Sequence, residues 1–229
     1  MKPSNLKAPF SWNACKPMIQ DRILYAPGLF GDTEDLLFPG WKDASLFGND
    51  QPVCIEYCSG NGLWIAAKAE AHPEINWIAV EKKFLRVRKV WSKIKNLNLK
   101  NLIVVCGEAY EATKRYFPAE SFSSAYINFP DPWPKRRHAR HRLIQPRFIE
   151  EVWRTLVPGA VFSLVTDDPD YSIKMLDEMC GHNGFESCHA TPYFVTEIVD
   201  YGTSSFDQLW REQGKLIRYH QFKKICKKN

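Results

Sequence analysis

Short apolar runs alternate with amphipathic segments through most of the chain beyond residue 50. The apolar runs predict buried strands at residues 53–57, 77–80, 102–106, 124–129 and 160–165. Between them, apolar positions at helical spacing or helix-favouring composition predict helices at 63–71, 84–94, 109–117, 148–156 and 171–180, and Pro158-Gly159 is expected to stop the fourth. Residues 216–225 have strand character and could add an edge strand.

Strands that alternate with single helices are typical of βαβ units. The predicted fold class is therefore α/β, with a doubly wound, mostly parallel sheet and helices on both of its faces. Residues 1–50 are rich in Pro, Gly and aromatic side chains and lack this alternation. We expect them to form an irregular N-terminal extension packed on a single globular domain of residues 51–229.

Composition narrows the class of protein. The chain has 45% hydrophobic and 25% charged residues and a net charge of +5, which are ordinary globular proportions and exclude a disordered or coiled-coil chain. No apolar stretch approaches the roughly 18 residues of a membrane span, and we expect no secretory signal, since residues 1–5 lead into no apolar region. The cysteines number seven, with no C-x-x-C pair, so we expect free thiols, no metal site and a cytoplasmic protein.

Carboxylates recur where the predicted strands end. In an open α/β sheet, ligands bind beyond the carboxyl ends of the strands. Glu81, Glu108, Asp131 and Asp167 follow four successive strands, and Glu56 lies within the first. Polar loops often contain one such residue, but the whole series predicts a ligand site at this edge of the sheet.

The turn after the first strand, Ser59-Gly60-Asn61-Gly62, indicates the kind of ligand. Glu81 follows Gly60 by about 20 residues, the offset at which an acid binds a ribose diol in adenosine cofactors. The third glycine of G-x-G-x-x-G is missing, and no P-loop motif occurs, which disfavours a nicotinamide enzyme and a nucleotide-phosphate site. A carboxylate-lined pocket suits the cationic sulfur of S-adenosylmethionine.

The stretch from Asn128 to His138 is the most informative in the chain. Its prolines at 130, 132 and 134 hold the loop extended, which presents Asp131 and Trp133 on a stiff arm. Five Lys and Arg residues follow between positions 135 and 142, and residues 82–100 form a second basic stretch without an acid. Cations around an acidic pocket predict a polyanionic substrate whose base enters the pocket.

These motifs together resemble a known family. The segments IEYCSGNG, IAVEKK, GEA, NFPDPWPKRRH, VTDDPDY and SSFDQLWREQG occur in the order and spacing of the bacterial tRNA (guanine-N7-)-methyltransferases, over about residues 50–220. The resemblance implies a seven-stranded, Rossmann-like methyltransferase fold that uses S-adenosylmethionine. It also implies methylation of a guanine in the variable loop of tRNA.

The resemblance assigns roles to individual residues. Glu56, Glu81 and Glu108 match contacts to the methionine end, the ribose and the adenine region of the cofactor. The full set of expected cofactor-binding residues is Glu56, Ser59, Gly60, Gly62, Glu81, Glu108, Asn128 and Asp131. Asp131 also matches the catalytic acid. The expected substrate-binding residues are Lys135, Arg136, Arg137, Asp167, Ser204 and Asp207.

The chain departs from the family pattern at four of its positions. The family usually has Gly at the position of Cys58 and Asp at that of Glu108. It has Thr and Glu where Ser204 and Asp207 stand, in an element that closes over the target base. Cys58 is expected to crowd the cofactor turn, whereas the other three changes keep the hydrogen-bonding chemistry of the site.

Guanine N7 carries a lone pair and no proton, so its methylation needs alignment and electrostatic support rather than a general base. We expect Asp131 to supply that support, Asp167 and Asp207 to accept from the guanine edge, and Trp133 to stack on a base or anchor its loop. Two other functions remain open, an amino-methyltransferase acting on another base and a non-catalytic RNA-binding module. The expected partner is tRNA, and the protein would act as a monomer or homodimer.

Overall fold

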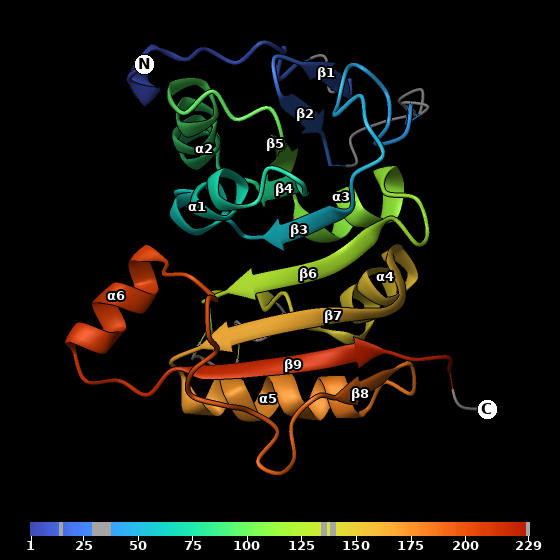
Figure 1. The fold of residues 1–229 in the computed structure, drawn as a ribbon, viewed down its shortest axis with the longest axis vertical. Coiled ribbons are helices and arrows are strands. Elements are labelled where there is room, and N and C mark those ends of the chain that lie inside the picture. Colours follow the sequence, from blue (N-terminus) through green and yellow to red (C-terminus); the bar gives the residue numbers. More distant parts are fainter. Residues whose placement is uncertain (14–15, 29–37, 134–136, 138–140, 228–229) are drawn as a thin grey trace. The chain divides into compact units, whose positions relative to one another are not determined.

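The computed structural model describes residues 1–13, 16–28, 38–133, 137 and 141–227 (Figure 1). Contacts within the chain divide it into two compact units, Met1–Pro118 and Ala119–Asn229. Each unit contains its own group of paired strands and its own helices.

The first unit is built on five strands in the order β1-β2-β5-β4-β3. They are β1 (Met18–Gln20), β2 (Ile23–Ala26), β3 (Val53–Tyr57), β4 (Asn76–Glu81) and β5 (Leu102–Gly107). β1 pairs with β2 antiparallel, and the other pairs are parallel. Its helices are α1 (Leu63–Ala71), α2 (Phe84–Asn96) and α3 (Ala109–Tyr116), and a short 3-10 helix, η1, spans Pro3–Asn5.

The second unit contains four strands in the order β6-β7-β9-β8. They are β6 (Phe122–Asn128), β7 (Leu156–Thr166), β8 (Phe185–Ser187) and β9 (Arg218–Lys224). β6 and β7 are parallel, while β9 is antiparallel to both β7 and β8. The helices are α4 (Pro146–Thr155), α5 (Pro169–Cys180) and α6 (Ser205–Glu212).

Burial explains why the strand predictions succeed in the first unit. Every residue of β3 and β4 is buried, as expected for parallel strands covered on both faces. Such strands appear in the sequence as continuous apolar runs rather than as an alternation. α2 buries Val87, Val90, Trp91 and Ile94 and leaves a charged face to solvent. α1 and α2 pack against each other beside these strands (Figure 1).

The N-terminal segment is more regular than the sequence predicts. Residues 18–26 form the β1–β2 hairpin, and β2 pairs in parallel with β5 along the whole of its length. The expectation of an irregular segment is therefore wrong for these residues. The reason is that β2 spans only four residues, too few to show a period in the sequence. Gly107 permits the close approach of the two strands, since a Cβ there would lie 2.5 Å from the Ala26 carbonyl oxygen.

Pro158-Gly159 does not act as the helix stop that the sequence predicts. α4 ends at Thr155, and β7 begins at Leu156, before the Pro-Gly pair. Phe122 pairs with Leu156 and Ser124 with Val161, so the register shifts and the exposed Pro158 and Gly159 lie in an irregular part of β7. A bulge of this kind accommodates a proline, which donates no ladder hydrogen bond.

Two further expectations about the sheet are corrected. The described residues contain nine strands rather than seven, because the β1–β2 hairpin adds to the seven strands that the methyltransferase fold implies. β9 is an interior strand of its unit, since it pairs with β7 on one side and β8 on the other. β8 takes the edge position and escaped prediction because it is only three residues long.

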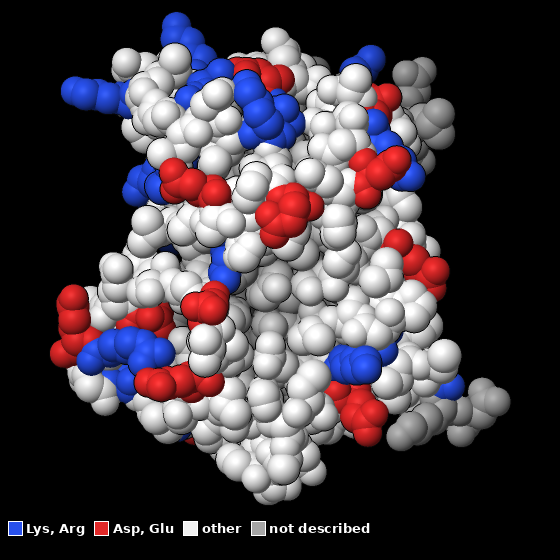
Figure 2. All heavy atoms as spheres, viewed as in Figure 1, with Lys and Arg blue, Asp and Glu red and all other residues white. Residues whose placement is uncertain are grey.

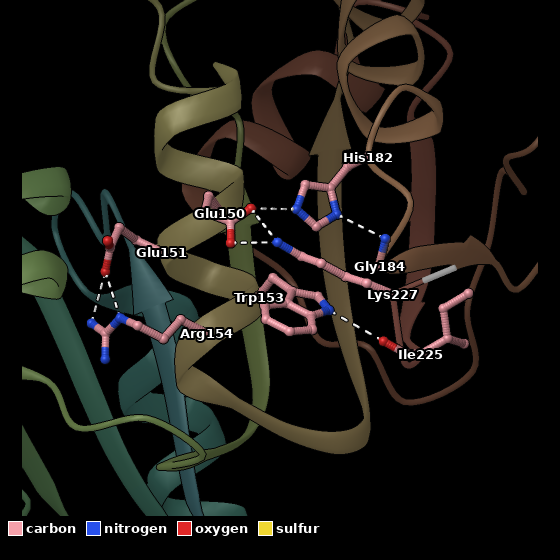
Figure 3. Close-up of polar contacts among 8 residues, drawn as sticks. All are labelled: Glu150, Glu151, Trp153, Arg154, His182, Gly184, Ile225 and Lys227. Atoms are coloured by element: carbon pink, nitrogen blue, oxygen red, sulfur yellow. Dashed lines mark hydrogen bonds and ion pairs between the residues drawn. The ribbon is translucent and has the colours of Figure 1, made fainter. Parts of the chain in front are cut away.

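The C-terminal tail of the second unit is fastened to α4 (Figure 3). The Glu150 carboxylate accepts hydrogen bonds from the Lys227 ammonium at 2.6 Å and from His182 Nε2 at 3.0 Å. Trp153 Nε1 donates to the Ile225 carbonyl at 3.2 Å, and the Lys227 ammonium lies over the Trp153 ring. These contacts join α4 to residues far along the chain.

Two properties concern the described ranges as a whole. None of their helices has the length and apolar character needed to cross a membrane. Six cysteines in these ranges form no disulfide bond, and Cys54 and Cys106 are buried in strands. Cys58 lies exposed in the turn after β3.

Candidate functional site

The turn after β3 has an unusual backbone. Cys58, Gly60 and Gly62 have φ values of 58°, 58° and 68°, in the left-handed region. Gly62 has a second reason to lack a side chain, because a Cβ there would lie 2.7 Å from Val90 Cγ2 on α2. The turn therefore exposes backbone at a strand end, where a ligand can approach closely.

Glu81, the last residue of β4, contacts the turn after β3 and the start of α2. Its carboxylate is buried and accepts hydrogen bonds from the backbone N–H of Gly60 at 3.2 Å and of Lys83 at 2.8 Å. Arg86 Nη1 lies 3.7 Å from Glu81 Oε2. Burial, followed by the charge of Glu81, raises the pKa of the Cys106 thiol to about 12. Glu81 thus places its carboxylate at the carboxyl end of β4.

Two other expected carboxylates lie on the neighbouring strands. Glu56 is buried within β3, and its carbonyl accepts a hydrogen bond of 2.8 Å from the Ser59 hydroxyl. Glu108 follows β5, is exposed, and caps α3 by accepting from the Glu111 N–H at 3.0 Å. Because β3, β4 and β5 are parallel neighbours, their carboxyl ends bring these groups to one edge of the first unit.

The donor set at this edge fits an adenosine cofactor. A carboxylate offers about four lone-pair positions, and the backbone N–H groups of Gly60 and Lys83 use two of those on Glu81. The remaining positions suit the two hydroxyl groups of a ribose. Gly60 and Gly62 place no side chain in front of the turn.

The second unit positions the other expected residues. Asn128 ends β6, is buried, and its Oδ1 accepts from the Tyr201 hydroxyl at 2.8 Å. Phe129 follows with φ 51°, and its N–H donates to the Val165 carbonyl at 2.9 Å. This bend turns the chain out of the sheet, and Asp131 is exposed on the loop beyond it.

Arg142 braces that loop. Its Nε donates to the Pro132 carbonyl at 2.7 Å and its Nη2 to the Trp133 carbonyl at 3.3 Å, while its guanidinium lies over the Tyr171 ring. The sequence grouped Arg142 with cations that hold phosphates, but in the structure it stabilises the loop.

The Trp133 ring lies 5.4 Å from that of His141. Lys135 and Arg136, with residues 138–140, fall outside the described residues, and Arg137 is exposed.

Asp167 directly follows β7, and the Lys215 ammonium contacts its Oδ2 at 2.6 Å. The same ammonium lies 3.4 Å from the centre of the Trp210 ring. Asp167 is therefore an acceptor held between a strand end and the segment that follows α6.

Ser204 and Asp207 belong to the first turn of α6. The Ser204 hydroxyl caps the helix by accepting from the Asp207 N–H at 3.1 Å. The buried Asp207 carboxylate accepts from Arg211 Nε at 3.1 Å and from the Tyr219 hydroxyl at 3.1 Å. Burial raises the pKa of Tyr219, and its hydrogen bond with Arg211 raises the pKa of that guanidinium.

Charge is distributed unevenly over the first unit. Figure 2 shows several Lys and Arg side chains over the part of this unit that holds α2 and the N-terminal segment. The exposed cations of the 82–100 stretch are Lys82, Lys83, Lys89 and Lys100. Lys95 is paired with Asp21 at 2.6 Å. In the described part of the chain, no cluster of three or more His, Cys, Asp or Glu side chains could hold a metal ion.

Comparison with known proteins shows the family to which the chain belongs. Residues 50–219 match the family model described as "Putative methyltransferase". A tRNA (guanine-N(7)-)-methyltransferase of Chlamydia caviae is 42% identical over 226 residues, which cover 98% of each chain. The chain belongs to the tRNA (guanine-N(7)-)-methyltransferase family. The family also includes a protein of Rubrobacter xylanophilus, 31% identical over 82% of this chain and 83% of its own.

Solved structures support the fold of this family member. A 16S rRNA methyltransferase superposes with a TM-score of 0.58 at 14% identity, covering 79% of this chain and 91% of its own. An S-adenosylmethionine-dependent O-methyltransferase from Thermotoga maritima gives 0.52 at 13% identity, covering 79% and 62%. At this identity the likeness concerns the fold alone, and it confirms the Rossmann-like methyltransferase class.

In this tRNA (guanine-N(7)-)-methyltransferase family member, the structure gathers one part of the expected site. Glu56, Ser59, Gly60, Gly62, Glu81 and Glu108 lie at one edge of the first unit. Asn128, Asp131, Asp167, Ser204 and Asp207 lie in the second unit, and their roles, like those of the first group, stay predictions. The sequence did not reveal Tyr201 and Tyr219, whose partners lie far along the chain, or the role of Arg142, whose partners are backbone carbonyls.

Proposed function

We propose that this protein transfers a methyl group from S-adenosylmethionine to N7 of a guanine in the variable loop of tRNA. The observation that carries the proposal is the 42% identity to a tRNA (guanine-N(7)-)-methyltransferase over 98% of both chains. The glycine turn held by the buried Glu81 adds support from the residues themselves.

The first unit would hold the cofactor. Glu81 would accept from the ribose hydroxyls, Glu56 would face the methionine end, and Glu108 would contact the adenine region. Ser59, Gly60 and Gly62 would shape the turn between them. When bound, S-adenosylmethionine supplies a methyl group attached to a positively charged sulfur.

Methylation of guanine N7 would require no proton transfer by the protein. Guanine N7 carries a lone pair and no proton, so no proton would leave the base when it takes the methyl group from the sulfonium. The methylated purine would carry the positive charge that the sulfonium loses. The exposed Asp131 on its braced loop would stabilise that charge electrostatically, and it needs no change of protonation state.

The second unit would recognise the substrate. Asp167 and Asp207 offer acceptors for the N1–H and the 2-amino group of guanine, both of which adenine lacks, and Ser204 holds the helix turn that carries Asp207. Lys135, Arg136 and Arg137 would bind phosphates. The exposed cations of α2 and its flanks, Lys82, Lys83 and Lys89, would extend this contact along the RNA backbone.

The deciding experiment maps the product. Unmodified tRNA transcript is incubated with the protein and methyl-labelled S-adenosylmethionine, digested, and analysed by mass spectrometry. We expect 7-methylguanosine in the variable loop. Methylated adenine N6 or cytosine N4 would support the amino-methyltransferase alternative instead. Retained RNA with no product would support the non-catalytic module.

A matched pair of variants tests the cofactor assignment. Glu81→Ala should weaken S-adenosylmethionine binding by about 1–3 kcal/mol in calorimetry, because it removes a charged hydrogen-bond acceptor. Glu70→Ala, an exposed acid on α1, should bind normally. Equal affinities in two folded variants would contradict the role of Glu81.

We further propose that the protein works in the cytoplasm, where tRNA is modified in bacteria. The free cysteines of the described ranges suit a reducing compartment. Either a monomer or a homodimer is compatible with this function.

A further inference from the structure

One face of α2 contacts the turn of residues 58–62 and the neighbouring Glu81. Arg86, Val90 and Lys93 are spaced by four and three residues, so they share a face of the helix. Arg86 lies 3.7 Å from the Glu81 carboxylate, and Val90 packs where Gly62 leaves no room for a Cβ. The Lys93 ammonium donates to the Asn61 carbonyl at 2.8 Å.

Lys93 donates its hydrogen bond to the peptide group between Asn61 and Gly62, where the turn passes into α1. The Asn61 carbonyl belongs to the same planar peptide group as the Gly62 N–H, which donates to the Ser59 carbonyl at 2.8 Å. The Asn61 side chain accepts from the Leu63 N–H at 3.1 Å, at the start of α1. Holding the Asn61 carbonyl therefore fixes the orientation of the peptide at which the turn passes into the helix.

Lys93 is well placed for a structural bond of this kind. Its side chain is half-buried, and a charged donor makes a shorter and stronger hydrogen bond than a neutral one. Burial, followed by repulsion from Lys89, lowers the pKa of Lys93. Lys89 itself is exposed and free to meet solvent or RNA, so the two lysines face different surroundings.

We propose that Lys93 is a positioning residue for the cofactor, and that its bond to the Asn61 carbonyl keeps the 58–62 turn in the shape that receives S-adenosylmethionine. The proposal rests on the proposed function. It departs from the sequence-based expectation, which counts Lys93 among the cations that bind the tRNA backbone.

The test compares three variants by calorimetry with S-adenosylmethionine. Lys93→Met keeps the apolar stem and removes the donor, and we expect the dissociation constant to rise about tenfold. Lys93→Arg restores a charged donor and should stay within about threefold of wild type. Lys95→Met, which removes an ammonium paired with Asp21 on the same helix, should bind the cofactor like wild type.

Steady-state kinetics give a second readout. In Lys93→Met the KM for S-adenosylmethionine should rise about tenfold, while kcat at saturating cofactor and the affinity for tRNA change less than twofold. Should Lys93→Met fail to fold, Lys93→Gln, which keeps a neutral donor, is measured in its place with a smaller expected loss.

Several outcomes would overturn the proposal. Wild-type cofactor affinity in a folded Lys93→Met or Lys93→Gln protein would do so, as would a loss confined to tRNA binding. Failure of Lys93→Arg to restore affinity would show that the charged donor is not the cause. A wild-type protein that binds no cofactor would overturn this proposal and the proposed function together, whereas the other outcomes leave the function standing.

Discussion

At the scale of single residues, Asp131 carries the sharpest prediction. Asp131→Asn keeps the shape of the side chain and removes its charge. The single-turnover rate should therefore fall, because the activation free energy rises by about 2–4 kcal/mol. Because no proton leaves N7, the wild-type rate should be nearly flat from about pH 6.5 to 8.5. Rapid-quench methylation of tRNA measures both.

The exposed Asp170, in the first turn of α5, provides the control, and Asp170→Asn should keep the full rate. Binding of tRNA should change little in both variants, since phosphate contacts dominate it. An Asp131→Asn protein with the wild-type rate, or a wild-type rate that climbs tenfold per pH unit, would refute the electrostatic role.

Cys58 is a non-glycine residue whose backbone lies in the left-handed region. Its φ of 58° lies in a region that costs a non-glycine residue about 1–2 kcal/mol. Glycine removes that strain but loses about 0.5–1 kcal/mol of conformational entropy on folding. We therefore expect Cys58→Gly to raise the free energy of unfolding by about 0–1.5 kcal/mol, as measured by urea denaturation.

Cys58→Val is the matched control, because a β-branched side chain tolerates the left-handed region least. It should destabilise the protein by at least about 1 kcal/mol. A Gly variant less stable than the Val variant would contradict the argument from φ.

At the scale of elements, α6 is held in an unusual way. Asp207 is the residue of the helix that is buried, while Phe206 and Leu209 are exposed. The buried Asp207 carboxylate, which accepts hydrogen bonds from Arg211 and Tyr219, therefore anchors α6. In α2, buried apolar side chains have that role. Asp207, which is proposed to contact guanine, therefore also stabilises α6, and Ser204 caps it.

This arrangement predicts how α6 responds to substitution. Asp207→Ala leaves the Tyr219 hydroxyl and the Arg211 guanidinium without their acceptor, so exchange of the α6 amide hydrogens should accelerate at least tenfold. Ser204→Ala, which removes only the cap, should accelerate it about fivefold, in line with about 1 kcal/mol. Hydrogen-exchange mass spectrometry measures both changes. Glu212→Ala, at the exposed end of the helix, should have little effect, and equal protection in all three variants would contradict this account.

At the scale of the whole molecule, stability should depend on a buried histidine of the second unit. His220 Nδ1 must donate to the Tyr193 carbonyl at 2.9 Å, so Nε2 accepts from the Ser172 hydroxyl at 2.9 Å. Burial, with smaller effects of Arg218 and His189, lowers the pKa of His220 from its ordinary 6.5. The folded protein therefore favours the neutral ring.

The sign of the pH effect follows from that shift. Below about pH 6.5 the unfolded chain binds a proton that the folded protein resists, so the free energy of unfolding falls as the pH drops toward the folded pKa. The slope should reach at most about 1.4 kcal/mol per pH unit, and the stability should be fully present above pH 6.5. Chemical denaturation at pH 7.5, 6.5 and 5.5 measures it.

His220→Asn keeps a donor for Tyr193 and removes the titrating ring, so it should be less stable at pH 7.5 but show a flatter dependence between pH 6.5 and 5.5. His72→Asn, which removes a surface imidazole, should keep the wild-type slope. An unchanged slope in His220→Asn would assign the acid sensitivity to other groups.

Much of the architecture could be predicted because its signals are local. The strands β3 to β7 and the helices α1 to α5 appear in the sequence as apolar runs and amphipathic periods of ordinary length. β1, β2 and β8 span three or four residues each, too few for a period, and their pairing depends on strands distant in the chain. α6 was not predicted, although Phe206, Leu209 and Trp210 stand at helical spacing; that the helix buries Asp207 and exposes Phe206 and Leu209 is decided by the tertiary structure.

The candidate site divides in the same way. The carboxylates at the strand ends, the glycine turn and the proline-rich loop are matters of residue type and spacing, so the sequence by itself determined the fold class, the family resemblance and the cofactor chemistry. Only the tertiary structure decided what surrounds these residues. Arg142 braces carbonyls of the loop that follows β6, Lys93 holds a carbonyl 32 positions earlier, and Glu81 binds the N–H of Gly60. Backbone atoms carry no residue identity, so a hydrogen bond from a distant side chain to the backbone leaves no mark in the sequence.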